Sequence, residues 1–273
     1  MLTKLIRYEF RATRRMFIPA FLVVLVLSIA NGISLQFCTE NMSLPSGLLL
    51  TIYILSLFSV CVLAFVYMIE RFYTNLLGDE GYLMFTLPAR PSQLIWSKCI
   101  VSSIWFILTG IVCSISLVLM VTVLAAADGS FSMFFQGLHY GLQAIFQFNI
   151  NPLYFILCAV ELFVLSVVYI VNFNMHIYAC LSIGSLSNKH RLLVAFLAYL
   201  AFGVIQQILV ILFSGLSGIL HIPMYSITNW MNTVNPSTAF QFSMLSAFIL
   251  VIITTAVYFI ITNYILSKRL NLQ

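Results

Sequence analysis

Six long apolar runs are the feature of this sequence that most restricts its fold. A helix needs about 20 apolar residues to cross the hydrocarbon core of a bilayer, and each run has at least this length. Only 7% of the 273 residues are charged and 62% are hydrophobic, whereas about a quarter of a soluble domain is charged. We therefore predict an all-α membrane protein, a single transmembrane domain over residues 1–273. The predicted spans are Phe17–Gln36, Gly47–Ile69, Lys98–Ala125, Pro152–Leu181, Leu192–Phe213 and Phe242–Leu266.

Residues 1–15 are predicted to form an amphipathic interfacial helix. At about 100° per residue, one face carries five cations and the opposite face is apolar. The cations are Lys4, Arg7, Arg11, Arg14 and Arg15, and the apolar residues are Leu2, Leu5, Ile6 and Phe10. Such a helix lies along the membrane with its cations towards anionic headgroups. Glu9 lies on the apolar face, where it could pair with a cation of the bundle or of another subunit, or reach the surface; we favour the surface.

Three connecting segments are long enough to have structure of their own. Residues 71–97 form the only sizeable polar segment between two spans. Residues 126–151 are predicted to hold an interfacial helix, because polar residues interrupt the segment every three or four positions. Residues 214–241 are rich in Gly, Ser, Asn and Pro yet half apolar. We expect this segment to form a pair of short re-entrant helices at the outer leaflet.

The positive charges predict the orientation. With both termini in the cytoplasm, all 12 Lys and Arg residues of the sequence fall on the cytoplasmic side, as the positive-inside rule requires. They are Lys4, Arg7, Arg11, Arg14, Arg15, Arg71, Arg90, Lys98, Lys189, Arg191, Lys268 and Arg269. Residues 71–97 are therefore predicted to form a cytoplasmic loop.

The sequence NLLGDEGYLMFTLP, from Asn75 to Pro88, is the most distinctive part of that loop. Two glycines bracket an acidic pair, an apolar and aromatic patch follows, and a proline ends it. This order predicts a turn and a short amphipathic helix. The segment is suited to docking a partner; the alternative is an ordinary solvated loop. The residues concerned are Asn75, Gly78, Asp79, Glu80, Gly81, Tyr82, Leu83, Phe85, Leu87 and Pro88.

Motifs for catalysis and for metal or nucleotide binding are missing from the sequence. It contains no phosphate loop ending in Gly-Lys-Ser/Thr, no His-Glu-x-x-His, no Cys-x-x-Cys and no Gly-x-Ser-x-Gly. Six irregularly spaced cysteines are typical of packing residues rather than of a metal site. We expect no catalytic or metal-binding residues and no cofactor in this chain.

A polar stripe inside the fourth span is the remaining candidate site. Glu161, Asn172 and His176 lie on nearly one face of this predicted helix, and an intramembrane acid suggests function by default. The stripe could line a substrate path or hold a cationic group; alternatively, a protonated Glu161 could hydrogen bond to a neighbouring Ser or Thr. The two outer members are about 22 Å apart along the helix, which is too far for joint acid–base catalysis.

The basic opening LIRYEFRAT, the six spans and the loop LLGDEGYLMFTLPARPSQLIWSK, Leu76–Lys98, together resemble the permease subunit of ABC-2 type transporters. The loop is the most specific part and is similar to that of permeases of Gram-positive bacteria. The resemblance implies that the residues from Asn75 to Pro88 couple to a separate ATPase subunit, which binds ATP and Mg²⁺. It also implies a second permease copy or paralogue, an exported substrate and the plasma membrane of a bacterium; no nucleic-acid partner is expected.

Two other function classes are weighed against a permease. An ATP-independent secondary transporter or channel would be favoured by internal repeats or several membrane charges, and we see no clear repeat and only Glu161. An intramembrane enzyme would need several polar catalytic residues at one depth, and only Glu161 and His176 are available.

Overall fold

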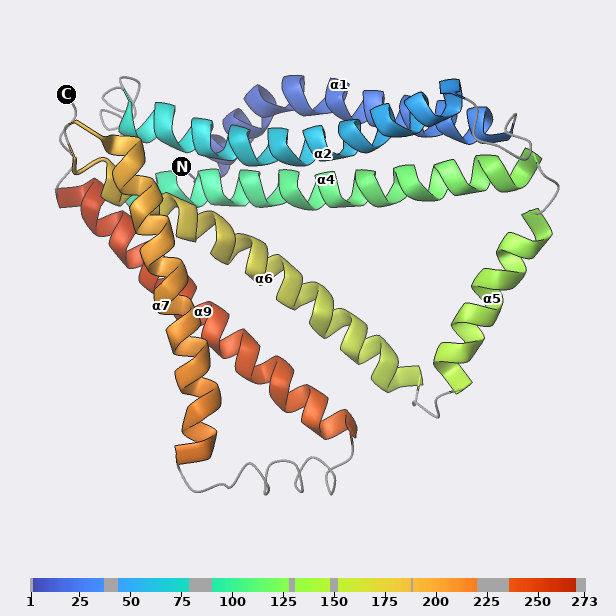
Figure 1. The fold of residues 1–273 in the computed structure, drawn as a ribbon. Coiled ribbons are helices and arrows are strands. Elements are labelled where there is room, and N and C mark those ends of the chain that lie inside the picture. The colour runs from blue at the N-terminus through green and yellow to red at the C-terminus, as the bar shows by residue number, and fades with distance from the viewer. Residues whose placement is uncertain are drawn as a thin grey trace. The chain divides into compact units, whose positions relative to one another are not determined.

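The computed structural model describes residues 2–36, 44–78, 90–127, 131–147, 152–187, 189–219 and 236–268, and these residues are almost entirely helical. The helices are α1 (Leu2–Gln36), α2 (Leu44–Phe72), η1 (Tyr73–Leu77), α4 (Pro91–Ala127), α5 (Phe131–Gln147), α6 (Pro152–Gly184), α7 (Arg191–Ile219) and α9 (Pro236–Lys268) (Figure 1). Six of them are long and apolar enough to cross a membrane. The prediction of a helical, multi-pass membrane protein is therefore confirmed.

Helix α1 is continuous, and in this it differs from the prediction of a separate interfacial helix over residues 1–15. It runs for 35 residues and passes through Pro19 without a break. At 1.5 Å per residue it is about 52 Å long, whereas the hydrocarbon core is about 30 Å thick. The basic first turns therefore extend the first span beyond the hydrocarbon.

Three other helix ends also differ from the predictions. Helix α4 begins at Pro91 instead of Lys98, because proline fits the first position of a helix, where its missing N–H is not needed. Helices α7 and α9 take up residues 214–219 and 236–241. These parts of the predicted re-entrant segment are therefore continuations of the spans, and residues 220–235 lie outside the described residues. The predicted interfacial helix within residues 126–151 is present as α5.

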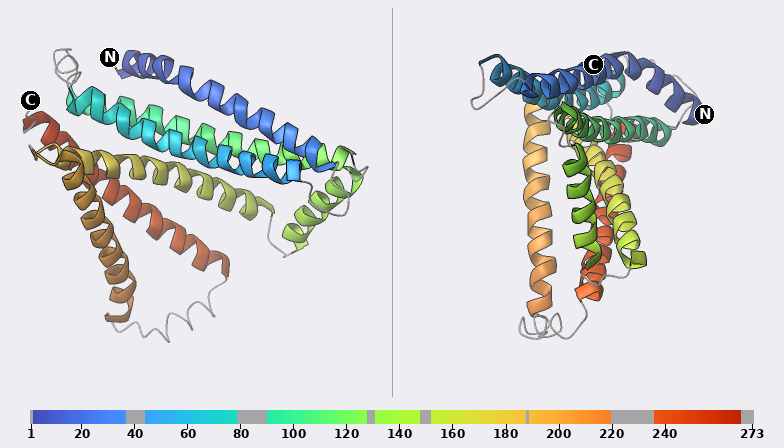
Figure 2. Two further views of the ribbon diagram at one scale, coloured as in Figure 1. Left: turned by 45° about the horizontal axis from the view of Figure 1, so that its top comes forward. Right: turned by 90° about the vertical axis from the view of Figure 1, so that its right-hand side faces the viewer.

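The chain divides into two compact units. The first comprises Met1–Glu70 and Trp96–Phe163. In it α1, α2 and α4 run side by side (Figures 1 and 2). Trp105 of α4 forms the centre of their contact, because Phe17 stacks on its ring at 4.4 Å and Phe10 at 5.0 Å between centroids. Such ring pairs add stability beyond the apolar area they bury.

A buried ion pair fixes the start of α1 against α4. Lys98 Nζ lies 2.9 Å from Glu9 Oε1, with 2% and 4% of the respective side-chain surfaces exposed. One turn further along α1, Trp105 Nε1 donates a hydrogen bond to Thr13 Oγ1 at 2.7 Å. The preference for Glu9 at the surface was therefore wrong. A buried charge is tolerated when an opposite charge compensates it at hydrogen-bonding distance.

Further along the first unit, polar contacts and one close approach join the same three helices. Asn31 Nδ2 donates to the carbonyl oxygen of Leu49 at 3.1 Å, and the hydroxyls of Tyr53 and Ser116 are 2.9 Å apart. A Cβ added to Gly32 would lie 2.8 Å from the side chain of Val123. Glycine at this position lets α1 and α4 approach more closely than any other residue would.

The second unit comprises Arg71–Ile95 and Val164–Gln273. In it the part of α6 from Val164 onward, α7 and α9 come together at one end, and α7 and α9 diverge from each other towards their connection (Figures 1 and 2). At the end where they meet, a Cβ added to Gly184 would lie 2.7 Å from the Cβ of Ala195. The last residue of α6 therefore allows the first turns of α7 to pack against it.

We predict that Lys98→Met lowers the free energy of unfolding by about 3–5 kcal/mol, because it leaves the carboxylate of Glu9 buried without its partner. Chemical unfolding in detergent micelles measures this loss. The double variant Glu9→Leu with Lys98→Met should recover most of it, because no charge is then buried. The exposed Lys189 provides a matched control, and Lys189→Met should change stability little. A double variant as unstable as Lys98→Met alone would contradict the prediction.

Candidate functional site

The loop predicted to dock a partner is entered through an unusually wide helical turn. After α2, residues Tyr73–Leu77 form a π-helix, and the N–H of Gly78 donates to the carbonyl oxygen of Tyr73 at 2.8 Å. π-Turns are rare in proteins, and those that occur are often found at functional sites. The turn is anchored to α6, because Phe72 stacks on Tyr178 with 4.0 Å between ring centroids.

The helical turns that flank the loop are packed in the second unit. Asn75, Leu76 and Leu77 are buried on the α2 side, and Leu94 and Ile95 are buried at the start of α4. The loop is therefore joined to a packed helical segment on each side.

Only two of the predicted docking residues are among those that the structure describes. Asn75 is buried, so it supports the loop from the inside rather than presenting its side chain to a partner. Gly78 has extended backbone angles, φ −94° and ψ −168°, so it does not supply the sharp turn expected of it. Its role is steric, because an added Cβ would lie 2.9 Å from the carbonyl oxygen of Thr74. The others, Asp79, Glu80, Gly81, Tyr82, Leu83, Phe85, Leu87 and Pro88, lie outside the described residues.

The polar stripe on α6 ends in contacts between helices. Asn172 Nδ2 lies 2.9 Å from Thr254 Oγ1 and 2.8 Å from Thr255 Oγ1, both on α9. These hydrogen bonds join α6 to α9 inside the second unit. The period of the sequence placed Asn172 on the correct face, but it could not identify partners about eighty residues away.

His176 lies between the faces of two tyrosine rings. Its ring stacks on Tyr199 of α7 at 5.0 Å and on Tyr258 of α9 at 4.9 Å, and Phe202 approaches edge-on. The residue is only 8% exposed. His176 is thus a packing residue at the junction of three helices, and no sequence pattern had indicated the two tyrosines.

Glu161 lies towards the other end of α6 and is half-buried. Its Oε2 atom is buried without a hydrogen-bond partner among the described residues. The hydrogen bond to a neighbouring Ser or Thr that sequence reasoning allowed is not formed by this atom. His176 Nε2 is likewise buried without a hydrogen-bond partner among the described residues, so the stripe holds two polar atoms, Glu161 Oε2 and His176 Nε2, that could bind a ligand or a second chain.

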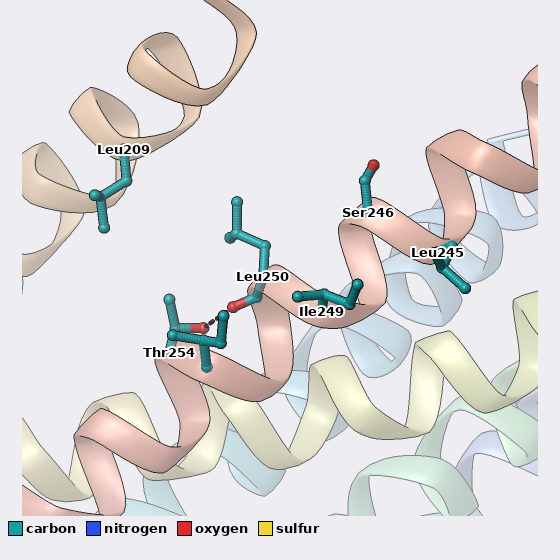
Figure 3. A pocket seen from close by; sticks show the side chains of 7 residues that line it. Leu209, Leu245, Ser246, Ile249, Leu250 and Thr254 are labelled. Carbon is teal, nitrogen blue, oxygen red and sulfur yellow. Dashed lines mark hydrogen bonds between the residues drawn. The ribbon is translucent and has the colours of Figure 1, made fainter. Parts of the chain in front are cut away.

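A pocket of about 400 Å³ opens between α7 and α9 where these helices diverge. Leu209 of α7 faces Leu250 and Thr254 of α9 across it (Figure 3). The remaining lining residues are Leu245, Ser246, Ile249 and Ile253. The pocket adjoins the polar stripe, because Thr254, one of its lining residues, also bonds through its hydroxyl to Asn172. Its volume and apolar lining suit a small hydrophobic ligand.

The described residues contain no cluster of three His, Cys, Asp or Glu side chains that could hold a metal ion. Comparisons of the chain with protein-family models, with functionally characterised proteins and with solved structures gave no match.

We predict that Ile249→Trp abolishes binding of a small hydrophobic fluorophore to the purified protein, because the indole would fill much of the pocket. Fluorescence titration in detergent gives the dissociation constant. Ile260 lies on the same helix, is exposed and does not line the pocket, so Ile260→Trp is the matched control and should bind like the native chain. Equal binding by both variants would place the fluorophore elsewhere.

We also predict that Gly78→Ala destabilises the π-turn by about 1–3 kcal/mol, as crowding of a packed site generally does. The amide hydrogens of Leu76 and Leu77 should then exchange at least about tenfold faster, since about 1.4 kcal/mol corresponds to tenfold. Gly203 of α7 has open space around it, so Gly203→Ala should leave their exchange unchanged. Unchanged exchange in Gly78→Ala would contradict the steric role of this glycine.

Proposed function

We propose that this chain is the membrane-spanning permease subunit of an ATP-driven exporter of the ABC-2 type. Each permease pairs with a second copy or a paralogue, and a separate ATPase subunit binds ATP and Mg²⁺. The complex lies in the plasma membrane of a bacterium, with both termini of this chain in the cytoplasm.

The observation that carries the proposal is the burial of the helical turns that flank residues 79–89 on both sides. A loop that transmits force must be joined to elements that move as rigid bodies. Leu76 and Leu77 anchor one end and Leu94 and Ile95 the other, all of them buried. A push on the loop is therefore passed to the helices α2 and α4 rather than absorbed by bending where the loop joins them.

In the proposed mechanism, ATP binding draws two ATPase subunits together, and each moves the loop docked on it. Asp79 and Glu80 pair with basic residues of the ATPase, while Tyr82, Leu83 and Phe85 fill an apolar groove, as aromatic anchors do in many interfaces. The loop then displaces α2 and α4. A shift between two states requires contacts that differ between them, and docking to an open or a closed ATPase pair supplies this difference.

The apolar pocket and Glu161 support a substrate class rather than a single substrate. The pocket favours a hydrophobic molecule, and the half-buried carboxyl of Glu161 can accept a cationic or hydrogen-bonding group. We propose a hydrophobic or amphipathic substrate, such as a peptide antibiotic, a lipid or a drug.

The proposal predicts that an ATPase of about 25–35 kDa, a typical single-domain size, co-purifies with the tagged chain from its native membranes in mild detergent. Reversing the acidic pair with Asp79→Lys and Glu80→Lys should abolish co-purification and the associated ATP hydrolysis. The altered chain should still insert in the membrane, because both positions lie outside the spans. Both readouts come from one preparation.

The matched control reverses two acids in the connections predicted to face the opposite side of the membrane, Glu40→Lys and Asp128→Lys. This variant carries the same change of net charge and should retain the ATPase. A chain that purifies alone and shows no ATP hydrolysis in several detergents would contradict the proposal and favour an ATP-independent transporter. Loss of the ATPase in both double variants would contradict the assignment of the docking loop.

A further inference from the structure

One face of α1 is exposed along the whole helix, and its chemistry changes part-way. Apart from the adjacent Arg14 and Arg15, its members follow one another at steps of three or four residues, so they form one continuous stripe. The first part of the stripe consists of Lys4, Arg7, Arg11, Arg14 and Arg15, and the second part of Ile18, Leu22, Val26, Ile29 and Ile33, all exposed. The stripe changes from cationic to apolar between Arg15 and Ile18.

The opposite face of α1 packs against α4, and this packing fixes which face of the helix is exposed. Glu9, Thr13 and Phe17 are buried against α4 through the ion pair, the hydrogen bond and the ring stack described above. Glu9 is the single acidic residue of α1, and its carboxylate is bound to Lys98. It is therefore not available to neutralise the cations, which form no ion pair with a described residue.

The apolar part of the stripe locates the surface of the bilayer. Exposed isoleucine, leucine and valine side chains are stable in contact with lipid tails, so the hydrocarbon begins near Ile18. Arg11, Arg14 and Arg15 lie within about 6 Å of each other along the helix axis, directly beside this boundary. Arg7 and Lys4 lie about 12 Å and 17 Å from Arg15, which exceeds the screening length of about 8 Å at physiological salt.

We infer that Arg11, Arg14 and Arg15 form a binding site for the phosphate groups of anionic phospholipids. Each guanidinium group can bind a phosphate through two parallel hydrogen bonds. A lipid is favoured over a protein partner because the same face of α1 continues without interruption into the part that contacts lipid tails. The site comprises only the three arginines nearest the start of the hydrocarbon. The inference does not depend on the proposed permease function.

The test measures binding of short-chain phosphatidylglycerol to the full chain in a non-ionic detergent, by thermophoresis. Phosphatidylcholine of the same chain length shows the contribution of the tails, and glycerol phosphate that of the free headgroup. Three forms are compared: the native chain, the triple variant Arg11→Gln, Arg14→Gln and Arg15→Gln, and the double variant Lys4→Gln and Arg7→Gln as the matched control.

Each cation close to an anionic surface strengthens binding about fivefold, so the triple variant should lose on the order of a hundredfold in affinity for phosphatidylglycerol. The double variant should lose less than about fivefold. Affinity of the native chain should fall as salt rises, and phosphatidylcholine should bind weakly to all three forms.

Three results would overturn the inference. Equal losses in the triple and double variants would indicate a general effect of positive charge. Glycerol phosphate binding as tightly as phosphatidylglycerol would indicate a site for soluble anions. An unchanged affinity in the triple variant would show that the three arginines do not bind the lipid and would favour a protein partner.

Misfolding is controlled by a second triple variant. Glutamine and lysine both have helix propensities close to that of arginine, and all three positions are exposed, so the packed face of α1 is not altered. Replacing the three arginines by lysine keeps the charge and should bind phosphatidylglycerol within about tenfold of the native chain. A lysine variant as weak as the glutamine variant would attribute the loss to disturbed helix packing and would also overturn the inference.

Discussion

The hydrocarbon core of a membrane offers no hydrogen-bond partners, and every polar group of this chain that lies there is subject to that constraint. The backbone satisfies it by forming helices, which bond their N–H and C=O groups internally. Many hydroxyl side chains do so by donating to carbonyls three or four residues earlier, as Ser28 does to Leu25 and Thr109 to Trp105. The remaining buried polar groups need partners on other helices, and these contacts determine which helices pack together.

The polar contacts therefore specify neighbours more closely than the apolar ones do. Leucine or valine faces can pack against many surfaces, whereas Asn172 requires acceptors where Thr254 and Thr255 provide them. Outside the hydrocarbon, the buried carboxylate of Glu9 likewise requires the cation of Lys98. The buried atoms Glu161 Oε2 and His176 Nε2 have no hydrogen-bond partner among the described residues, so neither contributes such a contact.

The number of spans and the position of most of their ends follow from the length of the apolar runs, and α1 ends at Gln36 as predicted. The same reasoning failed where two arrangements share one pattern. An acidic residue on the apolar face of a basic amphipathic segment looks alike in sequence whether it reaches the surface or pairs with a buried cation. Only the folded contact of Glu9 with Lys98 of α4 distinguishes the second arrangement. The early start of α4 at Pro91 was missed because Arg90 and the polar residues around it resemble a loop.

The candidate site was predictable in its local features and not in its long-range contacts. The spacing of Asn172 and His176 placed both on one face of α6, and the sequence drew attention to the glycine at position 78. The reason for that glycine, however, is the nearby carbonyl oxygen of Thr74, which depends on the π-turn and has no sequence signal. The two tyrosines that enclose His176 come from different helices, and only folding brings them to the same point.

The ion pair between Glu9 and Lys98 also bears on how the chain is made. Its partners are separated by 89 positions in the sequence, and synthesis proceeds at about 5–20 residues per second. For roughly 5–20 seconds the nascent chain therefore carries a carboxylate on the apolar side of its first helix with no counter-ion of its own. Helix α1 can pack in its final position against α4 only after the third span has been synthesised. The helices therefore do not pack together in the order in which they are translated.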